Sequence, residues 1–328
     1  MLPISELVRV ARLLDDHWHC QLAERAAARW GAAEAVFVRS SASHVFVAKQ
    51  ASGGSRIVLR MRPESTNAKT ILHRSAMAAE QLSRAGAPVV AAVRSRAGAL
   101  VESVDDYCIT AVALADGEVR DEDTANRSTA ADWGAALAEL HLRGAAVDLA
   151  QLPDMVDLCA PQDATRAQSQ PMDGRLRGVA DEVAADLATL PRDPAVRGLL
   201  HGDPELDNVV FTANGPVLVD LDDVRTGWRA ADVGFALRSW AVTAAAPDLA
   251  ADTPAAFLAG YRRRRPITDQ ELSWLPLFAR AAALETLREL APLLAHPAEP
   301  SWPAWATELD ERIRTHADDL STALLRRP

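Results

Sequence analysis

The sequence has 328 residues, 49% of them hydrophobic and 24% charged, and its 45 acidic residues outnumber the 35 basic ones to give a formal net charge of −10. This acidic balance argues against a nucleic-acid-binding protein, and the hydrophobic content argues against a chain that is mainly disordered. The length allows one large domain or two smaller domains with a buried core.

The first third of the chain predicts helices and an antiparallel sheet. Residues 5–30 combine charges with apolar side chains at a spacing typical of an amphipathic helix. Residues 67–86 predict another helix, which ends at Gly86. Strands are predicted where short segments are rich in β-branched and aromatic residues, with a turn at Gly53–Gly54 between the second and the third. These segments are AVFVRSS (35–41), HVFVAKQ (44–50), SRIVLRMR (55–62), ALVESV (99–104) and YCITAVAL (107–114).

The rest of the chain predicts mostly helices. A polar, turn-rich segment places a domain boundary near Asp116–Gly117. We therefore predict an α+β fold with two lobes. Residues 1–115 form an N-lobe with an antiparallel sheet and a helix, and residues 116–328 form a mostly helical C-lobe.

Residues 199–224, LLHGDPELDNVVFTANGPVLVDLDDV, carry the strongest chemical signal. Two short strands predict a hairpin that places Asn208 at the entrance of one strand and Asp220 at the exit of the other. An amide oxygen and a carboxylate suit Mg²⁺, and the carboxylate of Asp203 can accept the proton of an attacking hydroxyl. Protein kinases have the same order of H-x-D, an Asn five positions after the Asp, and a downstream Asp. The pattern predicts metal-assisted phosphoryl transfer; the alternative is ordinary turn chemistry with solvated acids.

This HGDxxxxN motif, followed by a strand that ends in Asp, resembles the aminoglycoside phosphotransferase-like (choline, fructosamine and homoserine kinase-type) branch of the protein-kinase-like fold. The resemblance implies that Asp203 is the catalytic base and that His201 orients its loop. It implies that Asn208 and Asp220 bind Mg²⁺. Asp232 resembles the Asp that connects the catalytic loop to a C-lobe helix in that family.

The resemblance also implies a nucleotide phosphate-binding site on the sheet and helix of the N-lobe. The loop between the first two predicted strands has no glycine, but Ser41 and Ser43 can offer N–H and hydroxyl donors. Arg60 occupies the third strand where the family shows Lys or Arg, and a guanidinium can bind phosphate through two parallel hydrogen bonds. The alternatives are that Arg60 is a solvated strand residue or that Lys49 is the phosphate-binding cation.

Two further nucleotide contacts are expected. Glu80 is the only acid in the helix over 67–86, and we expect it to pair with Arg60, although the family's usual position lies near His73 or Ser75. The alternative for Glu80 is a surface helix charge. The backbone around Ala111 and Ala113 is expected to bind an adenine edge, unless this segment is an edge strand without a ligand.

The predicted function is transfer of the γ-phosphoryl group of ATP, with Mg²⁺, to a hydroxyl of a small molecule. Acidic residues near Asp203, namely Glu205, Asp207 and Asp223, favour a cationic or neutral acceptor such as an aminoglycoside, amino sugar or amino alcohol. The same acids are also compatible with a solvated surface.

Three other functions stay open from the sequence. The DLDD segment with the spacing from Gly227 to Asp232 also resembles family members that phosphorylate protein Ser/Thr in stress responses. A regulatory protein that binds nucleotide without turnover is the second alternative. A metal-dependent phosphohydrolase is the third, but apart from His17 and His19 the other histidines lack the paired spacing that such sites use.

The expected setting is a reducing cytoplasm. Cys20, Cys108 and Cys159 lie far apart and form no CxxC pair, so neither a disulfide framework nor a zinc ribbon is expected. The N-terminal segment is charged, and no apolar run approaches membrane length. We therefore expect a small-molecule hydroxyl acceptor as partner and neither a membrane nor a nucleic acid.

Overall fold

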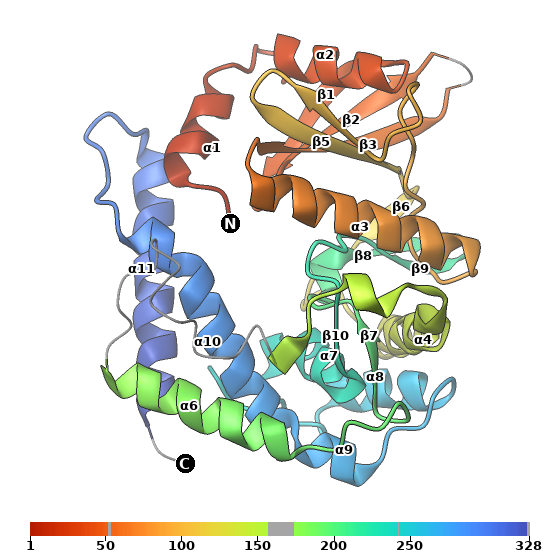
Figure 1. The fold of residues 1–328 in the computed structure, drawn as a ribbon, viewed down its shortest axis with the longest axis vertical. Helices are drawn as coiled ribbons and strands as arrows, with labels where there is room; N and C mark the ends of the chain where they lie inside the picture. The colour runs from red at the N-terminus through yellow and green to blue at the C-terminus, as the bar shows by residue number, and fades with distance from the viewer. Residues whose placement is uncertain (52–53, 157–173, 242, 327–328) are drawn as a thin grey trace. The chain divides into compact units, whose positions relative to one another are not determined.

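The computed structural model describes residues 1–51, 54–156, 174–241 and 243–326, coloured along the chain in Figure 1. Internal contacts divide it into two compact units. The first unit combines Met1–Glu118 with Val210–Asp223, and the second combines Val119–Val209 with Val224–Pro328. The expected boundary at 115/116 lies close to the first change of unit. The sequence-based boundary placed Val210–Asp223 in the C-lobe, whereas in the structure this segment packs with the N-terminal unit.

A five-stranded antiparallel sheet forms the first unit, in the order β1-β2-β3-β5-β4. The strands are β1 (Ala32–Ser40), β2 (His44–Gln50), β3 (Arg56–Pro63), β4 (Val101–Val104) and β5 (Tyr107–Ala113). All of the predicted strands are thus confirmed. Alternate side chains such as Phe46, Ile57 and Leu59 are buried in its core because successive residues of a strand face opposite sides. Of the predicted turn, Gly53 lies outside the described residues.

The expected single helix over residues 5–30 is wrong, because the chain forms α1 (Ile4–Ala11) and α2 (Gln21–Arg29). Between them the carboxylate of Asp15 accepts hydrogen bonds from the N–H groups of His17 and His19, which closes a turn. Cys20 then caps α2 through its sulfur. The polar turn therefore overrides the apolar periodicity that favoured one helix.

The predicted helix over 67–86 is confirmed as α3 (Thr66–Arg84), with Ser65 at its N-cap. Gly86 follows with a φ of +79°, a conformation that glycine adopts without strain.

The predicted hairpin is confirmed as β8 (Val209–Thr212) and β9 (Gly215–Leu218). With β6 (Gly117–Val119) they form a three-stranded sheet in the order β6-β8-β9. The N–H of Leu218 donates to the carbonyl of Pro88 at 2.7 Å, which attaches β9 to the segment after α3. The residues that follow β9, including Asp220 and Asp222, therefore belong to the first unit.

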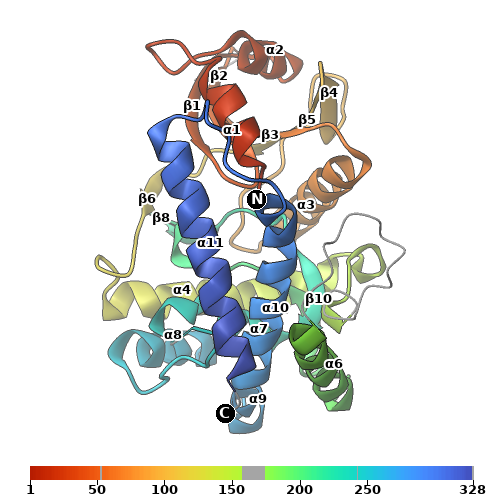
Figure 2. The ribbon, with the colours of Figure 1, turned by 90° about the vertical axis from the view of Figure 1, so that its left-hand side faces the viewer.

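The second unit is mainly helical, as predicted, and contains one two-stranded antiparallel sheet of β7 (Arg197–Leu200) and β10 (Arg225–Trp228). Helices α10 and α11 run side by side in Figure 2. Its described α-helices are α4 (Arg127–Arg143), α6 (Gly174–Thr189), α7 (Arg229–Ala236), α8 (Asp252–Arg262), α9 (Asp269–Ser273), α10 (Leu275–Leu294) and α11 (Ala304–Leu325). Among the described residues, no helix is both long enough and apolar enough to cross a membrane.

Helices α4 and α8 approach closely because glycines face the contact. A Cβ on Gly134 would lie 2.1 Å from the carbonyl oxygen of Phe257, and a Cβ on Gly260 would lie 1.8 Å from that of Ala131. Any side chain at either position would force the two helices apart.

Candidate functional site

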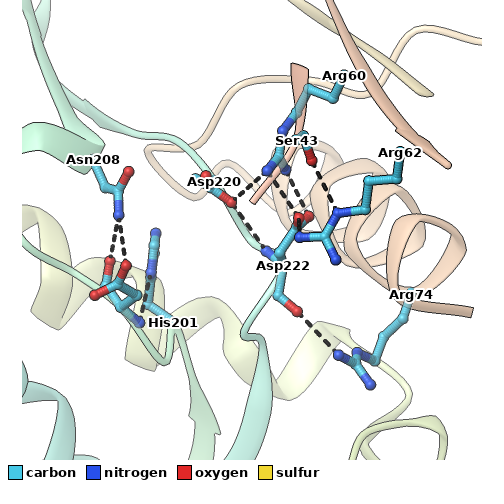
Figure 3. A network of polar contacts seen from close by, with 9 residues as sticks. Ser43, Arg60, Arg62, Arg74, His201, Asn208, Asp220 and Asp222 are labelled. Atoms are coloured by element: carbon cyan, nitrogen blue, oxygen red, sulfur yellow. Dashed lines mark hydrogen bonds and ion pairs between the residues drawn. The ribbon is translucent and has the colours of Figure 1, made fainter. Parts of the chain in front are cut away.

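The candidate catalytic loop belongs to the second unit and follows the buried end of β7. His201 is fully buried, and Gly202 has a φ of +90°, which favours glycine at the turn. The 3₁₀ turn Leu206–Asn208 then brings the side chain of Asn208 back toward Asp203. The Nδ2 group of Asn208 donates to the backbone oxygen of Asp203 at 2.9 Å and to its Oδ2 at 3.1 Å (Figure 3).

These contacts leave two oxygens available within the loop. The Oδ1 atom of Asp203 is buried and accepts no hydrogen bond from the described residues. The amide of Asn208 uses its nitrogen toward Asp203, so its oxygen points away from that residue (Figure 3). The loop therefore contains a carboxylate oxygen of a type that can accept a proton and an amide oxygen of a type that can bind a hard cation.

Asp232 on α7 anchors the backbone of this loop, as the sequence predicted. Its carboxylate accepts hydrogen bonds from the N–H groups of His201 at 2.7 Å and Gly202 at 3.0 Å. Burial alone would raise the pKa of Asp232, but the hydrogen bonds from His141 and from the backbone lower it below its ordinary value. Asp232 is therefore ionised at neutral pH and holds the loop through charge-assisted bonds.

The residues that hydrogen-bond to Asp232 from the helices around it, directly or through His141, were not predicted from the sequence. His141 on α4 lies 2.9 Å from Asp232 through Nε2 and 2.8 Å from the hydroxyl of Tyr261 through Nδ1. Burial lowers the pKa of His141 and raises that of Tyr261 to about 12. A neutral imidazole thus donates to Asp232 and accepts from Tyr261. The spacing of 91 residues between His141 and Asp232 gives no local sequence signal for this contact.

Arg238 was also missed. Its guanidinium lies 3.1 Å from Oδ1 of Asp203 and forms a two-pronged ion pair with Glu205. The candidate base therefore has a cation beside it. The negative charge of Glu205, which favoured a cationic acceptor in the sequence, is offset by the same arginine.

The first unit contains the candidate phosphate and metal residues at the end of β3 and after β9. Arg60 is buried, and its guanidinium donates to both oxygens of Asp222 at 2.6 and 2.8 Å (Figure 3). It also lies 2.9 Å from Oδ1 of Asp220. The alternative that Arg60 is a solvated strand residue is therefore wrong. Lys49 instead pairs with Glu34 and has a side chain that is 60% exposed.

The expected pair between Arg60 and Glu80 does not form. Glu80 pairs with Arg94 at 2.7 Å and with Arg84 at 3.0 Å. The physical reason is that Asp222 already satisfies Arg60 from another part of the chain, while Arg94 lies within reach of Glu80. The surface-charge alternative for Glu80 is thus the one that the structure supports.

The other residues expected to bind nucleotide already form some hydrogen bonds within the protein. The hydroxyl of Ser43 is buried and accepts from Nε of Arg62 at 2.9 Å, so Ser43 supports Arg62 rather than facing solvent. The Ser41 N–H donates to the Ser43 carbonyl. The Ala111 carbonyl accepts from Val93, and the Ala113 N–H donates to Ala91. These two backbone groups are therefore engaged by the segment 91–93, and the adenine contact around Ala111 and Ala113 stays a prediction.

The donor set fits a hard cation better than a soft one. Among the described residues, no group of three or more His, Cys, Asp or Glu side chains could hold a metal by itself. Asn208 and Asp220 offer oxygen, and the Asp220 side chain is 24% exposed. Mg²⁺ commonly binds through one or two protein oxygens together with substrate phosphates, and each of these two oxygens is of a type that suits it.

The overall match identifies the family. A model of the phosphotransferase enzyme family matches residues 34–267, which is most of the chain. The chain belongs to this family. The match includes β3, the catalytic loop and Asp232, so the family assignment covers every residue of the candidate site.

Curated relatives of this phosphotransferase family member include homoserine kinases. That of Xanthobacter autotrophicus is 29% identical over 216 residues, 63% of this chain and 65% of that protein. That of Methylobacterium radiotolerans is 32% identical over 195 residues, 56% of this chain and 59% of that protein. The chain thus spans less than two thirds of the length of these relatives.

Solved structures confirm the α+β, protein-kinase-like fold of this phosphotransferase family member. An amicoumacin kinase in complex with AMP-PNP and Ca²⁺ has a TM-score of 0.66 at 19% identity, covering 96% of this chain and 93% of that one. A microcompartment-associated aminopropanol kinase has a TM-score of 0.63 at 18% identity, covering 93% and 98%. At this level of identity the likeness establishes the fold.

Proposed function

We propose that the protein transfers the γ-phosphoryl group of ATP, with Mg²⁺, to a hydroxyl of a small amine-bearing molecule. The observation that carries the proposal is the Asp203 carboxylate, fixed by Asn208 on a loop that Asp232 anchors, in a chain of the phosphotransferase enzyme family. Membership of a phosphotransferase family favours transfer to an acceptor hydroxyl over metal-assisted hydrolysis and over binding without turnover.

Asp203 would orient the acceptor hydroxyl and take its proton at Oδ1. That oxygen accepts no hydrogen bond from the described residues, so an acceptor hydroxyl would share it with the nearby guanidinium of Arg238. The transition state of phosphoryl transfer is loose, so positioning matters more than base strength. The guanidinium of Arg238, 3.1 Å from the same oxygen, would help to fix the direction of this carboxylate.

Asn208 and Asp220 would hold Mg²⁺, which supplies neutralisation of the phosphate charge when bound. Arg60 would add a permanent positive charge on the phosphate side, because its guanidinium stays protonated at all relevant pH values. His201 would act through the backbone, since its Nδ1 accepts from the N–H of Asp203 at 3.3 Å.

The proposed class of acceptor is supported more by the names of similar kinases than by the acidic residues around Asp203. Homoserine kinases and an aminopropanol kinase are, by name, enzymes for small amine-bearing alcohols. Arg238 offsets Glu205, so the loop does not require a strongly cationic acceptor. We therefore place amino alcohols first, ahead of aminoglycosides and amino sugars, and a protein Ser/Thr acceptor last.

The test is an ADP-release assay over a panel of amino alcohols, hydroxy amino acids and aminoglycosides, with wild type and Asp203→Asn. Removing the base should lower kcat by about 100-fold or more with the best acceptor. Binding of AMP-PNP with Mg²⁺, measured by calorimetry, should change little, since Asp203 is proposed to face the acceptor. Asp186→Asn, an exposed acid on α6, is the matched control. Turnover of Asp203→Asn at the wild-type rate would exclude this role.

A further inference from the structure

Arg60 has an unusual partner for a cation on the third strand. Its guanidinium forms two parallel hydrogen bonds to the carboxylate of Asp222, a residue 162 positions away in sequence. The same guanidinium lies 2.9 Å from Asp220. A two-pronged bond fixes the plane of a guanidinium as well as its position. Asp222 thus determines the orientation of the Arg60 guanidinium, and with it the direction of the N–H groups that do not bind Asp222.

Asp222 is itself held from two elements of the same unit. Arg62, which shares a face of β3 with Arg60, donates to Oδ2 of Asp222 at 2.7 Å. Arg74 on α3 donates to the backbone oxygen of Asp222 at 3.0 Å (Figure 3). The Ser75 hydroxyl hydrogen-bonds to the Asp222 carboxylate. The Asp222 side chain is only 5% exposed. This degree of enclosure defines one orientation for the carboxylate.

The charges within this group balance. Arg60 and Arg62 face Asp220 and Asp222, so two cations meet two anions in a nearly closed environment. Burial alone would raise the pKa of Asp222, but the two guanidinium groups keep it below its ordinary value. A buried ion pair loses several kcal/mol when one member is removed, because the other charge stays behind without a partner.

Two site residues are connected through this carboxylate. Arg62 contacts both Asp222 and the hydroxyl of Ser43, in the loop between β1 and β2. Arg60 contacts both Asp222 and Asp220, the proposed metal ligand. A displacement of Asp222 would therefore disturb both the loop between β1 and β2 that contains Ser43 and the proposed metal ligand Asp220.

Helix α3 contributes no acid to Arg60. Its only acid, Glu80, points to Arg94 and Arg84. Ser75 of the same helix has no charge, and its hydroxyl hydrogen-bonds to the carboxylate of Asp222. We propose that Asp222 is the acid that positions Arg60 for the nucleotide phosphates, in place of an acid on α3. This role rests on the proposed phosphotransfer function.

The first test compares binding of AMP-PNP with Mg²⁺ to wild type, Asp222→Asn and Glu80→Gln by calorimetry, with circular dichroism as a check of folding. Asp222→Asn should weaken binding by about tenfold or more and raise KM for ATP, because Arg60 loses its fixed orientation. Glu80→Gln removes one carboxylate from the same unit and should change affinity by less than about twofold. A folded Asp222→Asn variant with wild-type affinity would overturn the assignment.

The second test moves the acid to the helix. In the double variant Asp222→Ser, Ser75→Glu, a carboxylate reaches toward Arg60 from α3, and net charge is unchanged. We expect this variant to bind AMP-PNP at least about fivefold more tightly than Asp222→Asn, or to bind it where Asp222→Asn fails to fold. A folded double variant without detectable binding would overturn the role.

The two proposals fail in different ways. Wild type that binds no Mg²⁺ nucleotide at all would reject the phosphotransfer function and the role of Asp222 with it. Wild type that binds nucleotide, with Asp222→Asn equal to it and Glu80→Gln weaker, would reject only the role of Asp222 and restore Glu80 as the acid.

Discussion

The carboxylate of Asp203 has a different neighbour on each oxygen. Oδ2 accepts from Asn208, whereas Oδ1 lies beside Arg238 without accepting a hydrogen bond from the described residues. One oxygen is thus used to fix the side chain, and the other lies beside Arg238. If Asp203 is the base that we propose, it would need little rearrangement of its own when an acceptor hydroxyl arrives.

A second polar cluster, around Glu6, stabilises the first unit. The carboxylate of Glu6 on α1 interacts with His44, Tyr107 and Arg9. Burial alone would raise its pKa, but the hydrogen bonds from these three side chains lower the pKa of Glu6 from 4.5 to about 2. The folded state therefore favours the ionised form of Glu6 more strongly than the unfolded state does.

This shift predicts a pH dependence of stability. Because the folded pKa lies below the unfolded one, the contribution of Glu6 is present above pH 4.5 and is lost as the pH falls toward about 2. We expect Glu6→Gln to reduce the free energy of unfolding at pH 7 by about 2 kcal/mol and to flatten its decline over that range. Urea titrations at several pH values measure both effects. Glu34→Gln, which breaks an exposed pair with Lys49, is the control, and equal slopes for Glu6→Gln and wild type would contradict the prediction.

At the scale of elements, the contact between α4 and α8 positions His141 and Tyr261 toward each other. Each helix contributes one of these residues and one glycine to the interface. A Cβ at Gly260 would lie 1.8 Å from a backbone oxygen of α4, and backbone atoms cannot move aside as a flexible side chain can. The catalytic loop thus depends on helix packing through Asp232 and His141.

Substitution of this glycine should be costly. We expect Gly260→Ala to lower the free energy of unfolding by on the order of 3 kcal/mol, since the helices must separate. Gly178→Ala on α6 is the matched control, because a Cβ there meets nothing within 4 Å. It should leave stability unchanged or raise it by roughly 0.5–1 kcal/mol, through better helix propensity. Thermal and denaturant unfolding followed by circular dichroism would show the difference, and equal effects at the two positions would be inconsistent with the packing argument.

The sequence predicts local features of this fold well and long-range pairs poorly. Alternation along β2 and β3, the hairpin before Asp220 and the spacing from Asp203 to Asn208 all depend on residues close in sequence. The contacts of Asp222 with Arg60 and of His141 with Asp232 depend on packing between distant segments. The pairing of Glu80 with Arg60 is wrong for this reason: Glu80 is the acid of α3, whereas the acid that pairs with Arg60 follows β9.

At the scale of the whole molecule, binding of nucleotide and metal should appear as a gain in stability. A ligand that binds only the folded chain, at roughly 100 times its Kd, stabilises by about 2.7 kcal/mol. We expect AMP-PNP with Mg²⁺ to raise the unfolding temperature, and EDTA or Asp220→Asn to remove most of the increase. Differential scanning fluorimetry over a nucleotide series measures it. An increase that persists in full with EDTA would argue against the proposed metal ligands.

The path of the chain between the units has a consequence for how the protein is made. The first unit receives Asp220 and Asp222 only when Val210–Asp223 has been synthesised, after the whole segment Val119–Val209. At roughly 10 residues per second, a nascent N-lobe on the ribosome waits on the order of ten seconds with Arg60 and Arg62 lacking their anions. A recombinant fragment that stops at Glu118 would keep that unbalanced positive charge permanently. Split-protein and fusion designs should therefore leave the hairpin and its two aspartates joined to the N-terminal sheet.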